Sequence, residues 1–243
     1  MDKPEILERL RNDEDYYGEF GQQFLSNSNI SALLNNPLEF NKPMVKGVPL
    51  VVGGYFHTAI LEPHKLDNFT ISDASSRNSK AYKEAANGDV LLLQKDVDNI
   101  EIMKEAILGN ELFNELITDG DVEYEVPGLV DLAGGQFKGK ADIINHTHKL
   151  IIDLKTSGSI DSFAHSAYKF NYDSQAYIYN QMFGYDFIFI VVDKTTHQVG
   201  LFDCSDRFLR SGEDKVERAV ANYEKFFGAG DYDLKQHYVT KTL

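Results

Sequence analysis

The sequence predicts an α/β fold in which a central mixed β-sheet is flanked by helices. Changes in hydrophobic spacing predict it. Apolar residues recur at helical spacing up to about residue 120, and from Asp121 they alternate as in β-strands. Beyond residue 160, helical and strand patterns follow each other again. Because 42% of the 243 residues are hydrophobic, the chain is long and apolar enough to bury such a core in one domain.

Two helices are predicted near the start of the chain. Residues 1–12 form a short helix, and residues 28–40 form a second. Ser28 or Ser31 is the expected cap of the second helix, because a serine side chain accepts a hydrogen bond from the first free N–H groups.

Further helices are predicted before the sheet. Residues 51–62 have helical spacing until Pro63, which cannot continue a helix. Residues 96–117 have the same spacing and are divided into two helices by Gly109.

The strands begin at Asp121. The segments DVEYEV, LVDLAGGQFKGKADIIN and KLIIDLK predict consecutive antiparallel strands. The apolar run DFIFIVVD predicts a central strand buried on both faces, with VGLFDC as its neighbour. Residues 161–184 predict a helix or a helix pair before that strand, and a last helix ends at Gly228 with Ser211 as its cap.

The net charge of −14 arises from 38 acidic and 24 basic side chains. An acidic chain is expected to repel phosphate backbones and anionic membranes. The acids are concentrated, however: residues 1–30 hold seven acids and three bases, and residues 89–125 hold eleven acids and two bases. The rest of the chain is nearly neutral, so its charge does not exclude a nucleic acid as partner.

Composition also predicts the cellular location of the protein. It has a single cysteine, Cys204, which excludes an internal disulfide framework and a cysteine-ligated cluster. No apolar run is long enough to span a membrane, and the acidic start lacks the basic and apolar regions of a signal peptide. We therefore expect a soluble cytoplasmic protein without a membrane partner.

The segment 139–156, GKADIINHTHKLIIDLKT, carries the main chemical signal. If Thr147 and His148 form its turn, Asp142 and Asp153 lie opposite each other on neighbouring strands, with β-carbons about 4.5–5.5 Å apart. Two carboxylates so placed repel each other unless a cation lies between them, which predicts a divalent metal site with hard oxygen ligands.

Lys155 lies on the same strand face as Asp153, because side chains two residues apart point the same way. A lysine beside a metal-bound carboxylate can hold a water and offset charge on a phosphate under attack. This D…DxK arrangement resembles the core of the PD-(D/E)XK nuclease superfamily. Without further motifs, the alternative is a salt-bridged surface hairpin.

Gln175 and Tyr179 are four residues apart and therefore lie on one helix face. A QxxxY helix after the DxK strand resembles the extra motif of the RecB-like branch, where both residues lie against the active site. The alternative is a core tyrosine beside a glutamine. The resemblance implies that Gln175, Tyr179, Thr156 and Lys140 contact DNA.

Upstream, the segment GGYFHTAILEP places His57 in a helix before Leu-Glu-Pro. It resembles the GxxxHxxxLEP stretch of phage exonucleases of the exonuclease VIII (RecE) type, where the histidine binds metal. Glu125 matches the glutamate that precedes the Gly-x-x-Asp strand in RecB-like nucleases, with Glu123 as the competing choice. The alternative for His57 is a core histidine whose hydrogen bonds are made within the protein.

The resemblance implies a restriction-endonuclease-like core and one nuclease domain over residues 1–243. Its expected parts are a helical extension (1–27), a helical region carrying the metal-binding histidine (28–120), a catalytic sheet-helix core (121–227) and a tail (228–243). Asp142, Asp153, Lys155 and Glu125 are the expected catalytic residues. His57, Asp142, Asp153 and the backbone carbonyl of Leu154 are the expected ligands of one or two Mg²⁺ or Mn²⁺ ions.

The implied activity is 5′-to-3′ exonucleolytic hydrolysis of linear double-stranded DNA. It would leave 3′ single strands for viral recombination, in the host cytoplasm if the chain is phage-encoded. The resemblance also implies a ring-shaped homo-oligomer and a single-strand annealing recombinase as partner. The alternatives are a RecB-like nuclease for single-stranded or flapped DNA and a non-catalytic acidic interaction protein of the same fold.

Overall fold

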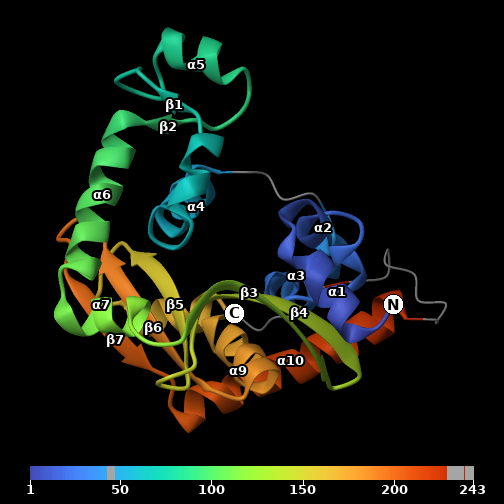
Figure 1. The fold of residues 1–243 in the computed structure, drawn as a ribbon. Helices are drawn as coiled ribbons and strands as arrows, with labels where there is room; N and C mark the ends of the chain where they lie inside the picture. Colours follow the sequence, from blue (N-terminus) through green and yellow to red (C-terminus); the bar gives the residue numbers. More distant parts are fainter. Residues whose placement is uncertain (43–46, 229–237, 239–243) are drawn as a thin grey trace.

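The computed structural model describes residues 1–42, 47–228 and 238 (Figure 1). Within them, the main sheet has five strands in the order β3-β4-β5-β6-β7. The strands span Val122–Leu132 (β3), Gly135–Asn145 (β4), Leu150–Ser157 (β5), Asp186–Asp193 (β6) and Val199–Asp203 (β7). β5 and β6 run parallel, and the other neighbouring strands run antiparallel. The predicted central mixed sheet is thereby confirmed.

Helices surround the sheet and account for most of the remaining described chain. The α-helices span Lys3–Arg11 (α1), Asp13–Tyr17 (α2), Asn27–Asn35 (α3), Val48–Leu61 (α4), Lys80–Ala86 (α5), Gln94–Leu108 (α6), Glu111–Thr118 (α7), Phe163–Lys169 (α8), Tyr172–Phe183 (α9) and Asp206–Phe227 (α10). The 3₁₀ helices span Gly21–Gln23 (η1), Pro37–Glu39 (η2) and Pro63–Asn68 (η3). None of the helices in the described ranges is both long and apolar enough to cross a membrane.

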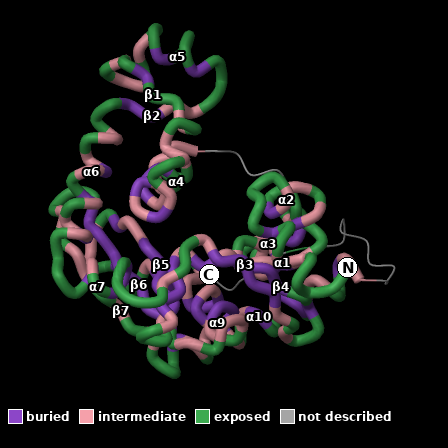
Figure 2. The backbone as a smooth tube through the Cα atoms, in the orientation of Figure 1, coloured by how far each residue is buried: buried purple, intermediate pink, exposed green. Residues whose placement is uncertain are grey.

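Alternate side chains of β5 and β6 enter two different cores, as expected for strands buried on both faces. Ile151 and Phe189 pack on the side of α3, α9 and α10, whereas Ile152 and Ile190 pack on the side of α4, α6 and α7. Figure 2 shows the buried residues concentrated along these strands and the helix faces turned toward them. The sheet is therefore covered by helices on both faces.

Two parts of the chain extend this three-layer arrangement. A small lobe holds α5 and the parallel pair Ile71–Ser72 (β1) and Leu92–Leu93 (β2), which the sequence did not predict. Figure 1 shows this lobe at the far end of α6. The N-terminal helices instead lie beside the β3-β4 hairpin, where Leu25 forms a bridge with Phe137.

Several predicted boundaries change. α3 begins after Ser26, whose backbone N–H donates to Asn29 Oδ1 at 2.8 Å, so the predicted caps Ser28 and Ser31 are wrong. The last helix begins after Ser205, whose hydroxyl accepts from the N–H of Phe208 at 3.3 Å. Ser211, the predicted cap, lies inside α10.

Other predicted breaks are confirmed. α6 ends at Leu108 with Gly109 as its C-cap, and the segment 161–184 contains a helix pair, α8 and α9. The division of the chain into functional parts stays a prediction. Its tail, 228–243, lies outside the described residues apart from positions 228 and 238.

Candidate active site

The candidate site lies where β4 and β5 separate. Ile143 pairs with Ile152, and the ladder keeps the predicted register as far as Asn145 and Leu150. It does not reach the next pair, Asp142 and Asp153. The hairpin closes through the four residues 146–149, so the predicted two-residue turn is wrong although the predicted register is confirmed. Where the ladder ends, the strands leave room for side chains between them.

Asp142 fills part of this gap. Its Oδ2 accepts a hydrogen bond from the backbone N–H of Leu154 at 2.9 Å and lies 3.1 Å from Nδ1 of His57. Burial would raise the pKa of Asp142, but the charge and hydrogen bond of His57 outweigh it, with help from Lys155 and the Leu154 N–H. The pKa of Asp142 therefore lies below its usual value. The pKa of His57 is raised, because the attraction of Asp142 exceeds the effect of burial.

Asp153 is almost fully buried on the neighbouring strand. Gln175 Nε2 donates to its Oδ1 at 2.5 Å, and Lys155 Nζ lies 2.6 Å from its Oδ2. This ion-pair contact lacks the alignment of a hydrogen bond, so Oδ2 is a buried acceptor without a hydrogen-bond donor. Burial and the charge of Asp142 raise the pKa of Asp153 to about 6, against the opposing effect of Lys155. The two acids are thus held in opposite electrostatic environments.

Glu125 lies on β3 between the paired residues Tyr124 and Val126, in the register position opposite Asp142. Its φ of 50° is in the left-handed region, an uncommon conformation for a residue with a β-carbon. Burial and the charge of Asp142 raise its pKa to about 7. Glu123, the competing choice, is instead hydrogen-bonded to His146 Nε2 at 2.9 Å, at the turn of the hairpin. Glu125 is therefore the glutamate beside Asp142.

Tyr179 lies beside the part of β4 that does not pair with β5. Its hydroxyl accepts from the backbone N–H of Lys140 and donates to the carbonyl of the same residue, both at 3.1 Å. The ring lies over Gly139, where a β-carbon would come 2.6 Å from the ring. Tyr179 is buried, so in this arrangement it positions the strand that carries Asp142.

The two remaining predicted DNA contacts, Lys140 and Thr156, flank the acids. Lys140 Nζ forms an ion pair with Asp13 Oδ1 at 2.6 Å, so a phosphate would have to compete with that carboxylate. Thr156 is half-buried and directly follows Lys155 on β5. The carbonyl of Leu154 faces the gap between the strands, because the N–H of the same residue bonds there to Asp142.

Sequence reasoning missed the contribution of α2. Loss of solvent and the charges of Asp13, Glu125 and Asp142 raise the pKa of Tyr17 to about 12. Lys138 donates to the carbonyl of Tyr16 and lies 4.2 Å above its ring. The Asp-Tyr-Tyr run of residues 15–17 is visible in the sequence, but no spacing connects it to residues more than 100 positions away.

The donor set fits a divalent cation. Among the described residues, no three His, Cys, Asp or Glu side chains are grouped closely enough to hold an ion as they lie, and Asp142 and Asp153 contact His57 and Lys155 instead. Nevertheless, Asp153 Oδ2 is a buried oxygen without a hydrogen-bond donor, and Asp142 lies across the gap from it. Carboxylate and carbonyl oxygens are the ligands that Mg²⁺ and Mn²⁺ prefer.

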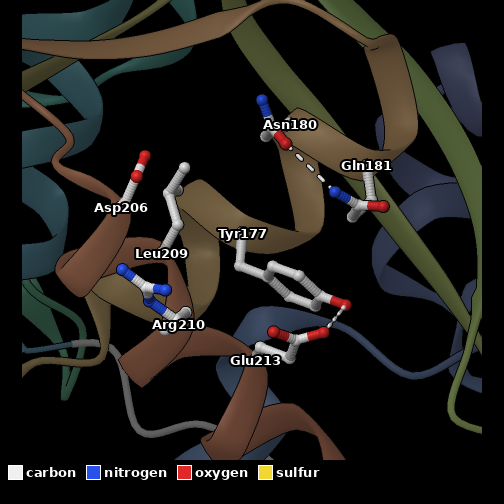
Figure 3. A pocket seen from close by; sticks show the side chains of 7 residues that line it. All are labelled: Tyr177, Asn180, Gln181, Asp206, Leu209, Arg210 and Glu213. Atoms are coloured by element: carbon white, nitrogen blue, oxygen red, sulfur yellow. Dashed lines mark hydrogen bonds between the residues drawn. The ribbon is translucent and has the colours of Figure 1, made fainter.

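A separate cavity of about 280 Å³ lies between α9 and α10 (Figure 3). Its lining includes Tyr177, Arg210 and Glu213, and the Tyr177 hydroxyl donates to Glu213 at 3.2 Å. Tyr177 is two residues from both Gln175 and Tyr179, so it faces the opposite side of α9. None of the lining residues belongs to the candidate active site.

A mixed sheet covered by helices, with two acids and a lysine where its hairpin opens, defines the class of PD-(D/E)XK nucleases. The family model described as "PDDEXK-like domain of unknown function (DUF3799)" matches residues 26–229, and the chain belongs to this family. No curated protein matches the chain. PD-(D/E)XK nucleases act on DNA and generally use divalent metal ions.

The chain is similar to solved structures, one of which shares its fold. One is a protein from Eubacterium rectale to which an exonuclease function has been assigned by name only, with a TM-score of 0.63 and 17% identity over 96% of this chain and 95% of that one. A phage-related exonuclease from Haemophilus somnus 129PT has 15% identity over 84% of this chain and 94% of that one. The TM-score of that match is 0.39. The resemblance to exonuclease VIII-type enzymes stays a prediction.

Proposed function

We propose that the chain is a metal-dependent exodeoxyribonuclease that hydrolyses phosphodiester bonds of linear double-stranded DNA. The observation that carries the proposal is the opening between β4 and β5, where Asp142 and Asp153 lie beside Lys155. The proposed 5′-to-3′ polarity is what the resemblance to phage exonucleases of the exonuclease VIII (RecE) type implies. The product would then carry 3′ single strands suited to viral recombination.

Asp142, Asp153, the Leu154 carbonyl and His57 would hold one or two Mg²⁺ or Mn²⁺ ions. When bound, such an ion lowers the pKa of a water and neutralises charge on the phosphate. His57 is already directed at Asp142, and Gln175 fixes the orientation of Asp153. These contacts hold the two carboxylates in place before a substrate binds, which reduces the reorganisation needed for the reaction.

Lys155 supplies a permanent positive charge next to the acids. Burial would lower its pKa, but Asp153 and Asp142 outweigh burial and raise the pKa above its usual value. The ammonium therefore stays protonated, and its role is to orient the attacking water and to stabilise charge that develops on the phosphate. Glu125, opposite Asp142, would bind an outer water.

Gln175 and Tyr179 act as positioning residues in this proposal, since both are engaged by the protein itself. Thr156 and Lys140 would contact the DNA backbone, and Lys140 would exchange Asp13 for a phosphate. A ring-shaped homo-oligomer and an annealing recombinase are the proposed protein partners. Sedimentation velocity of the chain with and without linear duplex tests the oligomer, and a purely monomeric profile in both samples contradicts it.

The activity is tested with duplex DNA labelled at either end, closed circles, single strands and flapped DNA, each with Mg²⁺, Mn²⁺ or a chelator. We expect release of nucleotides from the 5′ end of linear duplex, no attack on circles, and no reaction with chelator. Asp153→Ala should abolish the reaction, and Asp131→Ala, an exposed aspartate on β3, is the matched control.

The outcomes separate the alternatives. Preferential degradation of single strands or flaps would show that the chain is instead a RecB-like nuclease for single-stranded or flapped DNA. Cleavage of closed circles would indicate an endonuclease. No degradation of any substrate by the wild type, or equal rates in Asp153→Ala, would overturn the catalytic proposal.

A further inference from the structure

A large aromatic side chain lies exposed close to the candidate active site. Phe170, between α8 and α9, is 55% exposed, and Tyr168 beside it is also exposed. A single exposed aromatic residue is ordinary in a soluble protein. Two features of Phe170 are not ordinary: its connection to the catalytic residues and the rigidity of the loop that carries it.

Phe170 is linked to the acids by a short series of contacts. Its ring lies against that of Tyr172, with 6.1 Å between the centroids and an angle of 41°. Lys155 Nζ lies 4.7 Å from the centroid of Tyr172 and 2.6 Å from Asp153. Bases in one DNA strand are about 3.4 Å apart along the helix axis. The Phe170 ring is therefore within a few nucleotides of a phosphate held at Lys155.

The loop that carries Phe170 is fixed from several sides. Asn171 has a left-handed φ of 59°, its carbonyl accepts from Asn27 at 3.1 Å, and its side chain accepts from Lys215 at 2.9 Å. Lys215 Nζ also donates to the carbonyl of Tyr168 at 2.8 Å and to Asp173 at 2.7 Å. Residues from α3, α9 and α10 thus converge on this turn, so that the exposed ring is presented in a defined position.

The ammonium group of a lysine lies next to the Phe170 ring. Lys169 Nζ lies 5.5 Å from the centroid of Phe170. An aromatic face with a neighbouring lysine is the combination with which proteins bind unpaired nucleotides, because the ring stacks on the base and the cation attracts the phosphate. Every base has a flat aromatic face, so this form of recognition does not depend on sequence.

We propose that Phe170 stacks on the base at the DNA end that enters the active site, and so determines how the terminal nucleotide is held for cleavage. The proposal rests on the proposed nuclease function and adds the substrate feature that it recognises: a base whose face is free because it is terminal or unpaired. Tyr172 contacts the ring and connects it to Lys155. Lys169 lies where it can meet the phosphate of the stacked nucleotide.

The test compares Phe170→Ala, Phe170→Trp and the wild type on linear duplex DNA in Mg²⁺. Leu112→Ala is the matched control, because Leu112 is 54% exposed and lies on α7, which contributes no residue to the site. KM is measured for duplexes with an intact end and with an abasic terminal nucleotide. Loss of one base–aromatic stack corresponds to about 1–3 kcal/mol, or a KM increase of roughly 5- to 140-fold, where KM reports binding.

We expect Phe170→Ala to raise KM in this range with little change in kcat, and Phe170→Trp to stay within about twofold of the wild type. The abasic end should raise KM for the wild type and have no further effect on Phe170→Ala, a result that a merely structural role of Phe170 would not give. An unchanged KM in Phe170→Ala, or equal sensitivity of both proteins to the abasic end, overturns the stacking proposal and leaves the proposed nuclease function standing. Absence of degradation by the wild type overturns both proposals.

Discussion

The two walls of the candidate active site are held in different ways. The α9 wall, formed by α9 and α10, is anchored by an ion pair between Lys215 and Asp173, whose side chain is inaccessible to solvent. The α2 wall, formed by α1 and α2, contacts β4 through Asp13, which is 56% exposed and pairs with the nearly buried Lys140, and through Lys138, which donates to the carbonyl of Tyr16. Buried pairs fix geometry, whereas exposed pairs contribute little and weaken with salt. The α9 wall carries Gln175 and Tyr179, and the α2 wall lies on the side of Lys140.

The buried pair is expected to give the largest effect. Asp173→Ala removes an acceptor of Lys215 and Ser211 and leaves the largely buried Lys215 ammonium without its counter-ion, with only the neutral oxygens of Tyr168 and Asn171 as acceptors. We expect a loss of about 3–5 kcal/mol in the free energy of unfolding. Urea denaturation followed by circular dichroism measures it, and a loss below 1 kcal/mol would contradict the anchoring role.

Lys138 of β4, which contacts Tyr16 on the α2 wall, should make stability depend on pH. Burial and the charge of Lys140 lower its pKa from 10.5 to about 8. Between these values the unfolded chain binds more protons than the folded one, so stability rises as pH increases through this window. The unfolding free energy of the wild type relative to Lys138→Met should increase by about 2–3 kcal/mol from pH 7.5 to 10.5. A difference that is constant over this range would exclude the lowered pKa.

The contact between Tyr179 and β4 should tolerate no added volume. In Gly139→Ala the new methyl group would meet the Tyr179 ring, and overpacking of this kind costs about 1–3 kcal/mol. Activity should fall as well, because the same shift moves the strand that carries Asp142. Gly134→Ala is an informative comparison. A β-carbon there meets no atom within 4 Å, but the alanine backbone must adopt a positive φ of 91°. Thermal unfolding and nuclease rates of both variants, measured together, separate local strain from displacement of the site.

The smallest effect is expected at Asp13, the exposed partner of the pair with Lys140. Asp13→Ala should change the free energy of unfolding by less than about 1 kcal/mol. It also frees Lys140, so DNA binding should become tighter at low salt. Fluorescence anisotropy with labelled duplex at two salt concentrations measures this, and weaker binding by Asp13→Ala would show that Lys140 does not contact DNA.

Much of the fold follows from hydrophobic spacing. The strands from Val122 to Ser157, the buried strand of residues 186–193 and the hairpin register are local patterns, because each depends on alternation along one short segment. Helix ends were less predictable. The polar segment before Ser211 concealed the start of α10, and the hydrogen bond from Ser211 to Asp173 connects residues 38 positions apart.

The site could be predicted only where its residues lie in recognisable motifs. One hairpin carries Asp142, Asp153 and Lys155, and the helical segment that follows carries Gln175. These residues are therefore close in the sequence as well as in space. The left-handed backbone of Glu125 and the contact of α2 with β4 depend on tertiary packing. No alternation or motif spacing encodes such contacts, which is why Tyr16, Tyr17 and Asp13 were not predicted.

The most direct test of the central claim is the rate at which nucleotides are released from linear duplex DNA in Mg²⁺ by the wild type and by Asp153→Asn. Asn keeps the shape of the side chain and can still contact Gln175, but it removes the charge that a metal ion requires. We predict that the rate falls by at least about 10²–10³-fold, while unfolding stays cooperative. Equal rates for the two proteins would show that the opening between β4 and β5 is not the active site.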